Sequence, residues 1–140
     1  MSKRQPVWSD RLTVPLASRI PPRRRPAALK AIRIVHTAAF FVIAGCIAVF
    51  DWDGIRKRPG KRASLAAGIA FAEALTYASN NQVCPLTPLA EELGAKSGTV
   101  TDLYLPKAVS DRVPLVGGSA LMIGAAVHAL TLRERRAVRA

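Results

Sequence analysis

The sequence predicts an all-α fold: an integral membrane bundle of three transmembrane helices with a long, partly helical loop on one face. Half of its 140 residues are hydrophobic, yet it carries 21 Lys or Arg against 9 Asp or Glu. A soluble domain of this composition would be unusual. A small membrane protein combines apolar spans with basic segments outside the bilayer, so the length and composition indicate one membrane domain.

Three apolar segments define the predicted spans. Residues 31–50 and 113–132 are each about twenty residues long, and at about 1.5 Å per residue each crosses about 30 Å of hydrocarbon. Residues 63–83 are less apolar, because they are rich in Ala and contain Glu73 near their centre. A soluble core helix is the alternative for this segment, but its position between two clearer spans favours a third membrane helix.

Small residues at a spacing of four indicate where these helices approach one another. Gly68 and Ala72 are four residues apart, as are Ala120 and Gly124. Such small residues let helices pack closely in lipid.

The segments outside the spans are basic. Residues 1–30 form a mostly disordered tail in this interpretation, 51–62 a short loop with a Pro-Gly turn, and 133–140 a second tail. Their Lys and Arg side chains predict contact with anionic lipid headgroups, and Trp52 suits the membrane interface. The basic residues lack interleaved aromatics, which argues against nucleic acid as a partner. A multi-pass location in the cell membrane follows.

The loop 84–112 contains the densest polar chemistry and is expected to form one or two short helices. In the stretch TPLAEELGA, Thr87 can cap a helix, Pro88 suits its first position, and Gly94 can end it.

Polar residues at helical spacing on the first two spans predict a polar seam that opens toward this loop. An ionisable side chain inside a bilayer is costly, so Glu73 is expected to pair with His36 or Arg33, or to be protonated. Structural pairing and a functional site are both compatible with this pattern. The candidate residues of the polar seam are Arg33, His36, Glu73, Tyr77, Asn80 and Asn81.

The remaining His and Cys residues predict no cofactor and no metal ion. In the three-span threading, His36 and His128 lie about 16 Å apart in depth, too far to hold one haem iron. Cys46 and Cys84 fall on opposite faces, whereas a disulfide needs Cα atoms within about 7 Å. The stretch VIAGC, ending at Cys46, is typical of a lipoprotein processing site, but the apolar run continues past it and favours an uncleaved span.

The letters CPLTPLAEELGAKSG, followed by DLYLP and a last apolar run, resemble a family of small bacterial membrane proteins of unknown function marked by a Cys-Pro-Leu-Thr signature. The resemblance covers roughly residues 30–136 and implies fold and membrane location, but no activity. This chain departs from the family in its long basic N-terminal extension, in lacking a second His at the start of the second span, and in the position of Glu73. Residues that match or surround the signature, here called the signature loop, are Cys84, Pro85, Thr87, Glu91, Asp102 and Tyr104.

Two functional hypotheses remain. The first is a non-catalytic subunit or scaffold whose 84–112 loop docks a membrane-protein partner or a second copy of the chain. The alternative is a membrane-embedded thiol-redox, lipid-handling or proton-relay protein that uses Arg33, His36, Glu73 and Cys84. Cys84 has no general base at a known catalytic spacing, which favours the first hypothesis.

Overall fold

The computed structural model describes residues 6–95, 104 and 112–139, and every regular element within them is a helix. The all-helical fold class is therefore confirmed for these residues. The chain divides into two compact units, which are described separately. The N-terminal unit comprises the described residues of Met1–Ala39 and Leu75–Asp111, and the C-terminal unit those of Phe40–Ala74 and Arg112–Ala140.

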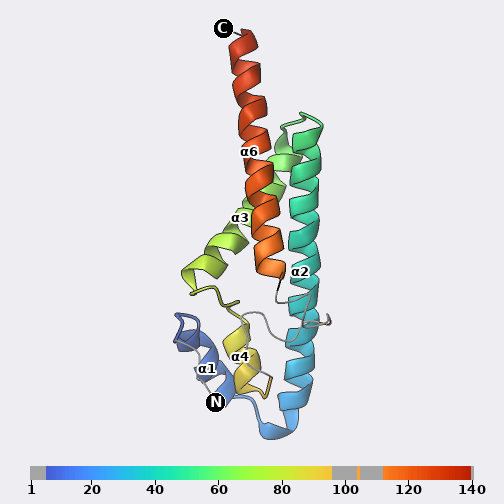
Figure 1. Cartoon of the computed structure of the whole chain (residues 1–140). Coiled ribbons are helices and arrows are strands. Elements are labelled where there is room, and N and C mark those ends of the chain that lie inside the picture. Colours follow the sequence, from blue (N-terminus) through green and yellow to red (C-terminus); the bar gives the residue numbers. More distant parts are fainter. Residues whose placement is uncertain (1–5, 96–103, 105–111, 140) are drawn as a thin grey trace. The chain divides into compact units, whose positions relative to one another are not determined.

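Two of the helices are long and apolar enough to cross a membrane, judged by length and composition. They are α2 and α6, and they contain the predicted spans 31–50 and 113–132. The predicted third span forms a helix, α3, but it is not one of these two. Its many Ala residues and Glu73 lower its hydropathy. The described elements are α1 (Asp10–Ser18), the 3-10 turn η1 (Pro22–Arg24), α2 (Arg25–Ile55), α3 (Lys61–Ser79), α4 (Thr87–Glu92) and α6 (Val113–Arg139) (Figure 1).

The structure differs from the predicted disordered tail over residues 1–30, because α1 lies within it. The Asp10 carboxylate accepts a hydrogen bond of 2.8 Å from the backbone N–H of Val7, which stabilises the first turn. Ala17, near the end of this short helix, is buried. Likewise, α6 continues through most of the predicted tail 133–140 and ends at Arg139.

The N-terminal unit is built around a small apolar core between α1 and α4, which lie side by side in Figure 1. Ala17 of α1 packs with Leu89 and Leu93 of α4. Partly buried residues from the α1–α2 connection and the start of α2 surround this cluster: Ile20, Ala28, Leu29 and Ile32.

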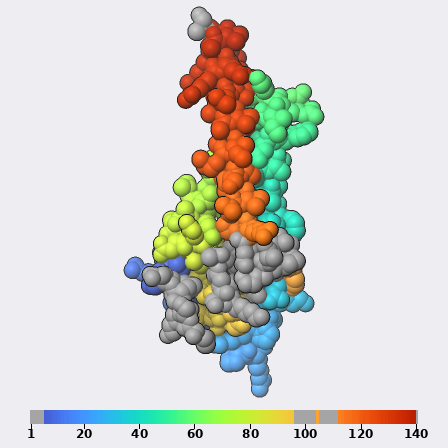
Figure 2. Space-filling model, in the orientation of Figure 1, coloured from blue at the N-terminus to red at the C-terminus, as the bar shows by residue number. Residues whose placement is uncertain are grey.

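The C-terminal unit is held by close helix packing. The buried face of α3 consists of alanines at helical spacing: Ala63, Ala66 and Ala70. This face packs in one apolar cluster with Phe50 of α2 and Leu121 of α6. In Figure 2 the last turns of α6 extend beyond the turn that joins α2 to α3.

Glycine positions distinguish real packing sites from apparent ones. A Cβ at Gly124 would meet the Asp51 carboxylate and would lie 3.0 Å from Phe50 Cδ1, so α6 lies close against α2 at this position. Gly124 is thus a packing position, as predicted. The prediction for Gly68 is wrong, because Gly68 is exposed and a Cβ there would meet no atom within 4 Å. The alanine face of α3 points in another direction.

Candidate functional site

The N-terminal unit contains most of the residues that the sequence singled out, and one of them, Asn80, joins two of its segments. Asn80 is fully buried just beyond the end of α3. Its Oδ1 accepts a hydrogen bond of 3.2 Å from the backbone N–H of Ser9, and its Nδ2 donates to Ser9 Oγ at 2.9 Å and to the Val83 carbonyl at 2.7 Å. A buried amide needs such partners. Asn80 therefore fastens the segment before α1 to the turn before Cys84, a contact that we call the Asn80–Ser9 clamp.

The two residues after Asn80 turn the chain. Asn81 and Gln82 have φ angles of 53° and 58°, in the left-handed region that a continuing right-handed helix does not use. The Gln82 N–H donates to the Tyr77 carbonyl at 3.0 Å, which closes the last turn of α3. The helix consequently ends at Ser79 rather than at the predicted residue 83.

Part of the signature loop, around the start of α4, lies inside the same unit. Residues 87–90, the first four of α4, are buried, and Thr87 is inaccessible to solvent. The prediction that Thr87 caps α4 is wrong: the N-cap residue is Leu86, and no side chain caps the helix. The prediction for Gly94 is confirmed, because its φ of 105° follows the last turn of α4. Proline and threonine in this signature thus fill space inside the unit.

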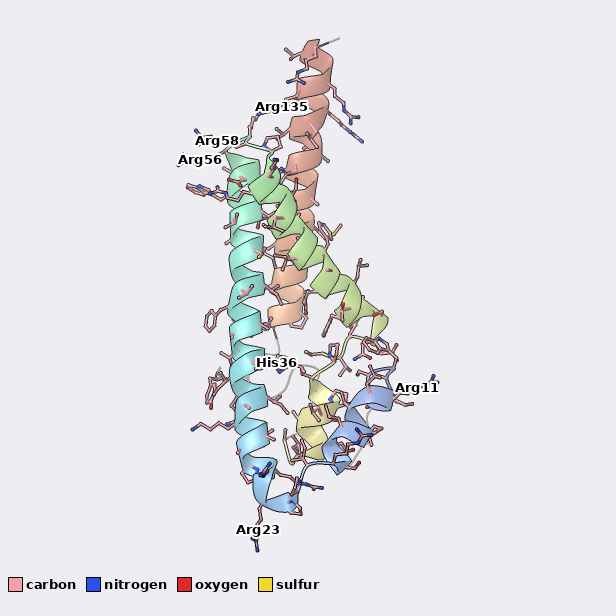
Figure 3. The ribbon with its side chains drawn as sticks, turned by 180° about the vertical axis from the view of Figure 1, so that it is seen from behind. Arg11, Arg23, His36, Arg56, Arg58 and Arg135 are labelled. Atoms are coloured by element: carbon pink, nitrogen blue, oxygen red, sulfur yellow. The ribbon has the colours of Figure 1, made fainter. Side chains whose placement is uncertain are left out.

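Arg33, a candidate from the predicted seam, contacts Tyr104 of the signature loop. The Arg33 guanidinium lies over the Tyr104 ring, 5.4 Å from its centroid, and the Tyr104 N–H donates to Thr37 Oγ1 at 3.1 Å. A cation–π contact of this kind contributes about 0.5–1 kcal/mol at an exposed site. His36, one turn after Arg33, is buried and points from α2 toward the side where α4 lies (Figure 3).

The structure places nearly all the described candidates in one unit. Glu73 belongs to the C-terminal unit, and its pairing with His36 stays a prediction. Asp102 lies outside the described residues. The candidates that share the N-terminal unit are Arg33, His36, Tyr77, Asn80, Asn81, Cys84, Pro85, Thr87, Glu91 and Tyr104.

Sequence reasoning missed Ser9 and Asp10, which hold the N-terminal segment in place. The signal was present: a Ser-Asp pair stands directly before the apolar letters of RLTVPLAS, a pattern typical of a helix start. The surrounding basic residues and prolines led to a disordered interpretation instead.

The C-terminal unit contains a second polar group. His128 is buried, its ring stacks on Phe50 with centroids 4.3 Å apart, and its Nε2 donates to the Phe50 carbonyl at 2.8 Å. The bond and the stacking give His128 a structural role between α6 and α2.

Charged residues gather at one end of this unit. The buried Asp53 carboxylate forms a salt bridge with Arg62 and accepts a hydrogen bond of 3.0 Å from Arg62 Nε. Arg135 donates to the Lys57 carbonyl at 2.6 Å, so the turn between α2 and α3 contacts the last turns of α6. Arg56, Arg58 and Arg135 lie near one another in Figure 3.

Comparisons with models of protein families, with curated proteins and with solved structures each give no match. The description of this protein therefore rests on its sequence and structure. The chain is an all-helical protein over its described residues, with two helices long and apolar enough to cross a membrane, and the first four residues of α4 are buried in its N-terminal unit.

Proposed function

We propose that the chain is a multi-pass protein of the cell membrane with α2, α3 and α6 as its spans. In this proposal it acts as a non-catalytic subunit or scaffold whose N-terminal unit docks a membrane-protein partner. The proposal is carried by one observation: the apolar helices are scarcely covered. Only 6% of the most apolar stretch of α2 and 22% of that of α6 are buried.

Exposure of this kind fits lipid as the surrounding medium. Phe41 and Val42 of α2 are 60% and 59% exposed, and Met122 and Ile123 of α6 are each 64% exposed. A soluble core helix would bury such residues, whereas a helix that is apolar all round suits a membrane. In water these side chains would form a large unfavourable surface.

The outer face of α3 supports its assignment as the third span. Leu65 and Ile69, opposite the buried alanine face, are 68% and 40% exposed, and Leu75 is 69% exposed. The helix therefore has an alanine side toward its neighbours and an apolar side toward the surroundings, which is the arrangement expected of a membrane helix in a bundle.

The signature loop supports a scaffold rather than a reaction. Thr87 and Pro88 are buried, and the Asn80–Ser9 clamp holds the turn before Cys84. In this proposal these contacts give the N-terminal unit a defined surface that a partner can bind. In this proposal the chain belongs with the small membrane proteins that carry the Cys-Pro-Leu-Thr signature, and the signature is a structural element.

The topology can be tested with two single-cysteine proteins. The first carries Cys46→Ser and retains Cys84. The second carries Cys46→Ser, Cys84→Ser and Gly60→Cys, at an exposed turn position with open space for a side chain. A membrane-impermeant maleimide should label the two from opposite sides of the membrane if α3 crosses it. Labelling from the same side would show two spans.

The docking role needs a separate test. Native membranes would be solubilised in mild detergent, and the size of the complex followed on native gels for the parent chain, Cys84→Ser and Asn80→Ala. The scaffold role predicts a complex that survives Cys84→Ser and is lost with Asn80→Ala. A free chain in the parent sample would contradict docking. Loss with Cys84→Ser alone would favour the thiol chemistry of Cys84 instead.

A further inference from the structure

Helix α1 has two unlike faces. Ser9 and Ala17 are 1% and 3% exposed and face the interior of the N-terminal unit. Trp8, Leu12 and Leu16 follow one another at intervals of four and are 43%, 67% and 50% exposed. Leu12 and Leu16, four residues apart, share a face of α1, and Trp8 lies in the turn just before the helix, so the three together present an apolar stripe outward.

Arginines border this stripe. Arg11 and Arg19 are exposed, and Arg11 points away from α4 in Figure 3. Arg23 and Arg24 follow in the exposed turn η1. An apolar stripe with Trp, flanked by arginines, is the chemistry of a helix that lies in the plane of a membrane interface.

The position of α1 along α2 agrees with such a location. Ala17 lies in the same apolar cluster as Ala28, Leu29 and Ile32 of α2. The apolar run of α2 begins at about residue 31, and the basic residues Arg25 and Lys30 of α2 precede it. Helix α1 is therefore held at the level where α2 passes from charged to apolar sequence, which is where headgroups meet acyl chains.

We propose that α1 is an interfacial anchor whose Trp8–Leu12–Leu16 stripe enters the headgroup region while Arg11 and Arg19 bind the phosphates of anionic lipids. This inference rests on the membrane location proposed above. The Asn80–Ser9 clamp then has a function of its own, because it sets the depth and orientation of the anchor relative to the signature loop.

The test uses the fluorescence of Trp8. The chain has two tryptophans, so Trp52→Phe leaves Trp8 as the only one. The full-length variant would be reconstituted into phosphatidylcholine vesicles with and without phosphatidylglycerol, and quenching measured with brominated acyl chains and with aqueous iodide. An interfacial helix buries its apolar face by about 5–10 Å, so brominated lipid should lower Trp8 emission about twofold or more and iodide should have little effect.

Two double variants, each made in the Trp52→Phe protein, separate the contribution of the apolar stripe from that of the arginines. Leu12→Gln with Leu16→Gln should reduce quenching by brominated lipid in both vesicle types. Arg11→Gln with Arg19→Gln should reduce it chiefly where phosphatidylglycerol is present. Both pairs change exposed residues, so the fold of the unit should tolerate them, and circular dichroism checks this.

Other outcomes would overturn the inference. If iodide quenches Trp8 and brominated lipid does not, the stripe does not enter the bilayer. If Trp8 is shielded from iodide in native membranes but accessible in lipid vesicles, a protein covers the stripe. Carbonate washing of the same vesicles tests the proposed membrane location separately. An integral protein stays with the vesicles whether or not α1 enters the bilayer, whereas release by carbonate would contradict the membrane location itself.

Discussion

Each of the two units of this small protein is stabilised internally by a different kind of contact. In the N-terminal unit, a buried amide satisfied by three hydrogen bonds joins the segment before α1 to the turn after α3. In the C-terminal unit, alanines and Gly124 let helices approach closely, and charged contacts lie at one end. Irregular backbone is ordered by satisfying its polar groups, whereas membrane helices gain little from burying apolar surface and rely on close packing.

The largest expected effect concerns the clamp. Asn80→Ala removes three hydrogen bonds of about 1 kcal/mol each and takes the Asn80 partner from the N–H and Oγ of the buried Ser9, so the N-terminal unit should lose about 3 kcal/mol. Hydrogen exchange should show α1 opening while α6 stays protected. The neighbouring change Ser79→Ala removes an exposed hydroxyl and serves as the control. Equal protection of α1 in both variants would mean that the clamp does not hold it.

Adding a single methyl group where α6 packs against α2 should lower the stability of the C-terminal unit. A Cβ at Gly124 would lie 3.0 and 3.1 Å from carbons of the Phe50 ring and against the Asp51 carboxylate. Gly124→Ala should therefore cost about 2 kcal/mol through overpacking. Gly118→Ala on the same helix, where a Cβ meets nothing within 4 Å, is the matched control and should leave stability unchanged or raise it by up to about 1 kcal/mol, because Ala favours a helix over Gly. Thermal unfolding in detergent compares the two, and equal effects would contradict close packing at Gly124.

The two units also differ in how far their features can be predicted from sequence. The long apolar runs predicted α2 and α6, because hydrophobicity over about twenty residues is a strong signal. Helix α1 was missed because it is short and its stability comes from Asn80, distant in sequence. The polar seam was assigned by helical spacing, which cannot anticipate that α3 ends at Ser79 and turns through Asn81 and Gln82. A long-range hydrogen bond decided the first case, and the left-handed backbone of Asn81 and Gln82 decided the second.

A smaller effect is expected at the buried carboxylate of Asp53. Arg62→Gln removes the cation that pairs with it, but the Arg62 side chain is 68% exposed and solvent weakens the interaction. The melting temperature should fall more than for Lys61→Gln, the control that removes the adjacent positive charge. Adding Asp53→Asn to Arg62→Gln should restore part of the loss, because the stranded carboxylate is then neutral. Additive losses would show that the two side chains act independently.

The smallest effect should come from the exposed ion pair between Lys57 and Glu134. Their charged atoms are 2.7 Å apart, but the side chains are 63% and 61% exposed, so water and salt screen the attraction. Glu134→Gln should therefore cost less than about 0.5 kcal/mol, and its melting curve in detergent should differ little between low and high salt. The hydrogen bond from Arg135 to the Lys57 carbonyl remains and keeps the turn in contact with α6. If Glu134→Gln instead destabilised the protein as much as Gly124→Ala, surface charge would hold the C-terminal unit, and the contrast drawn between the two units would fail at this end.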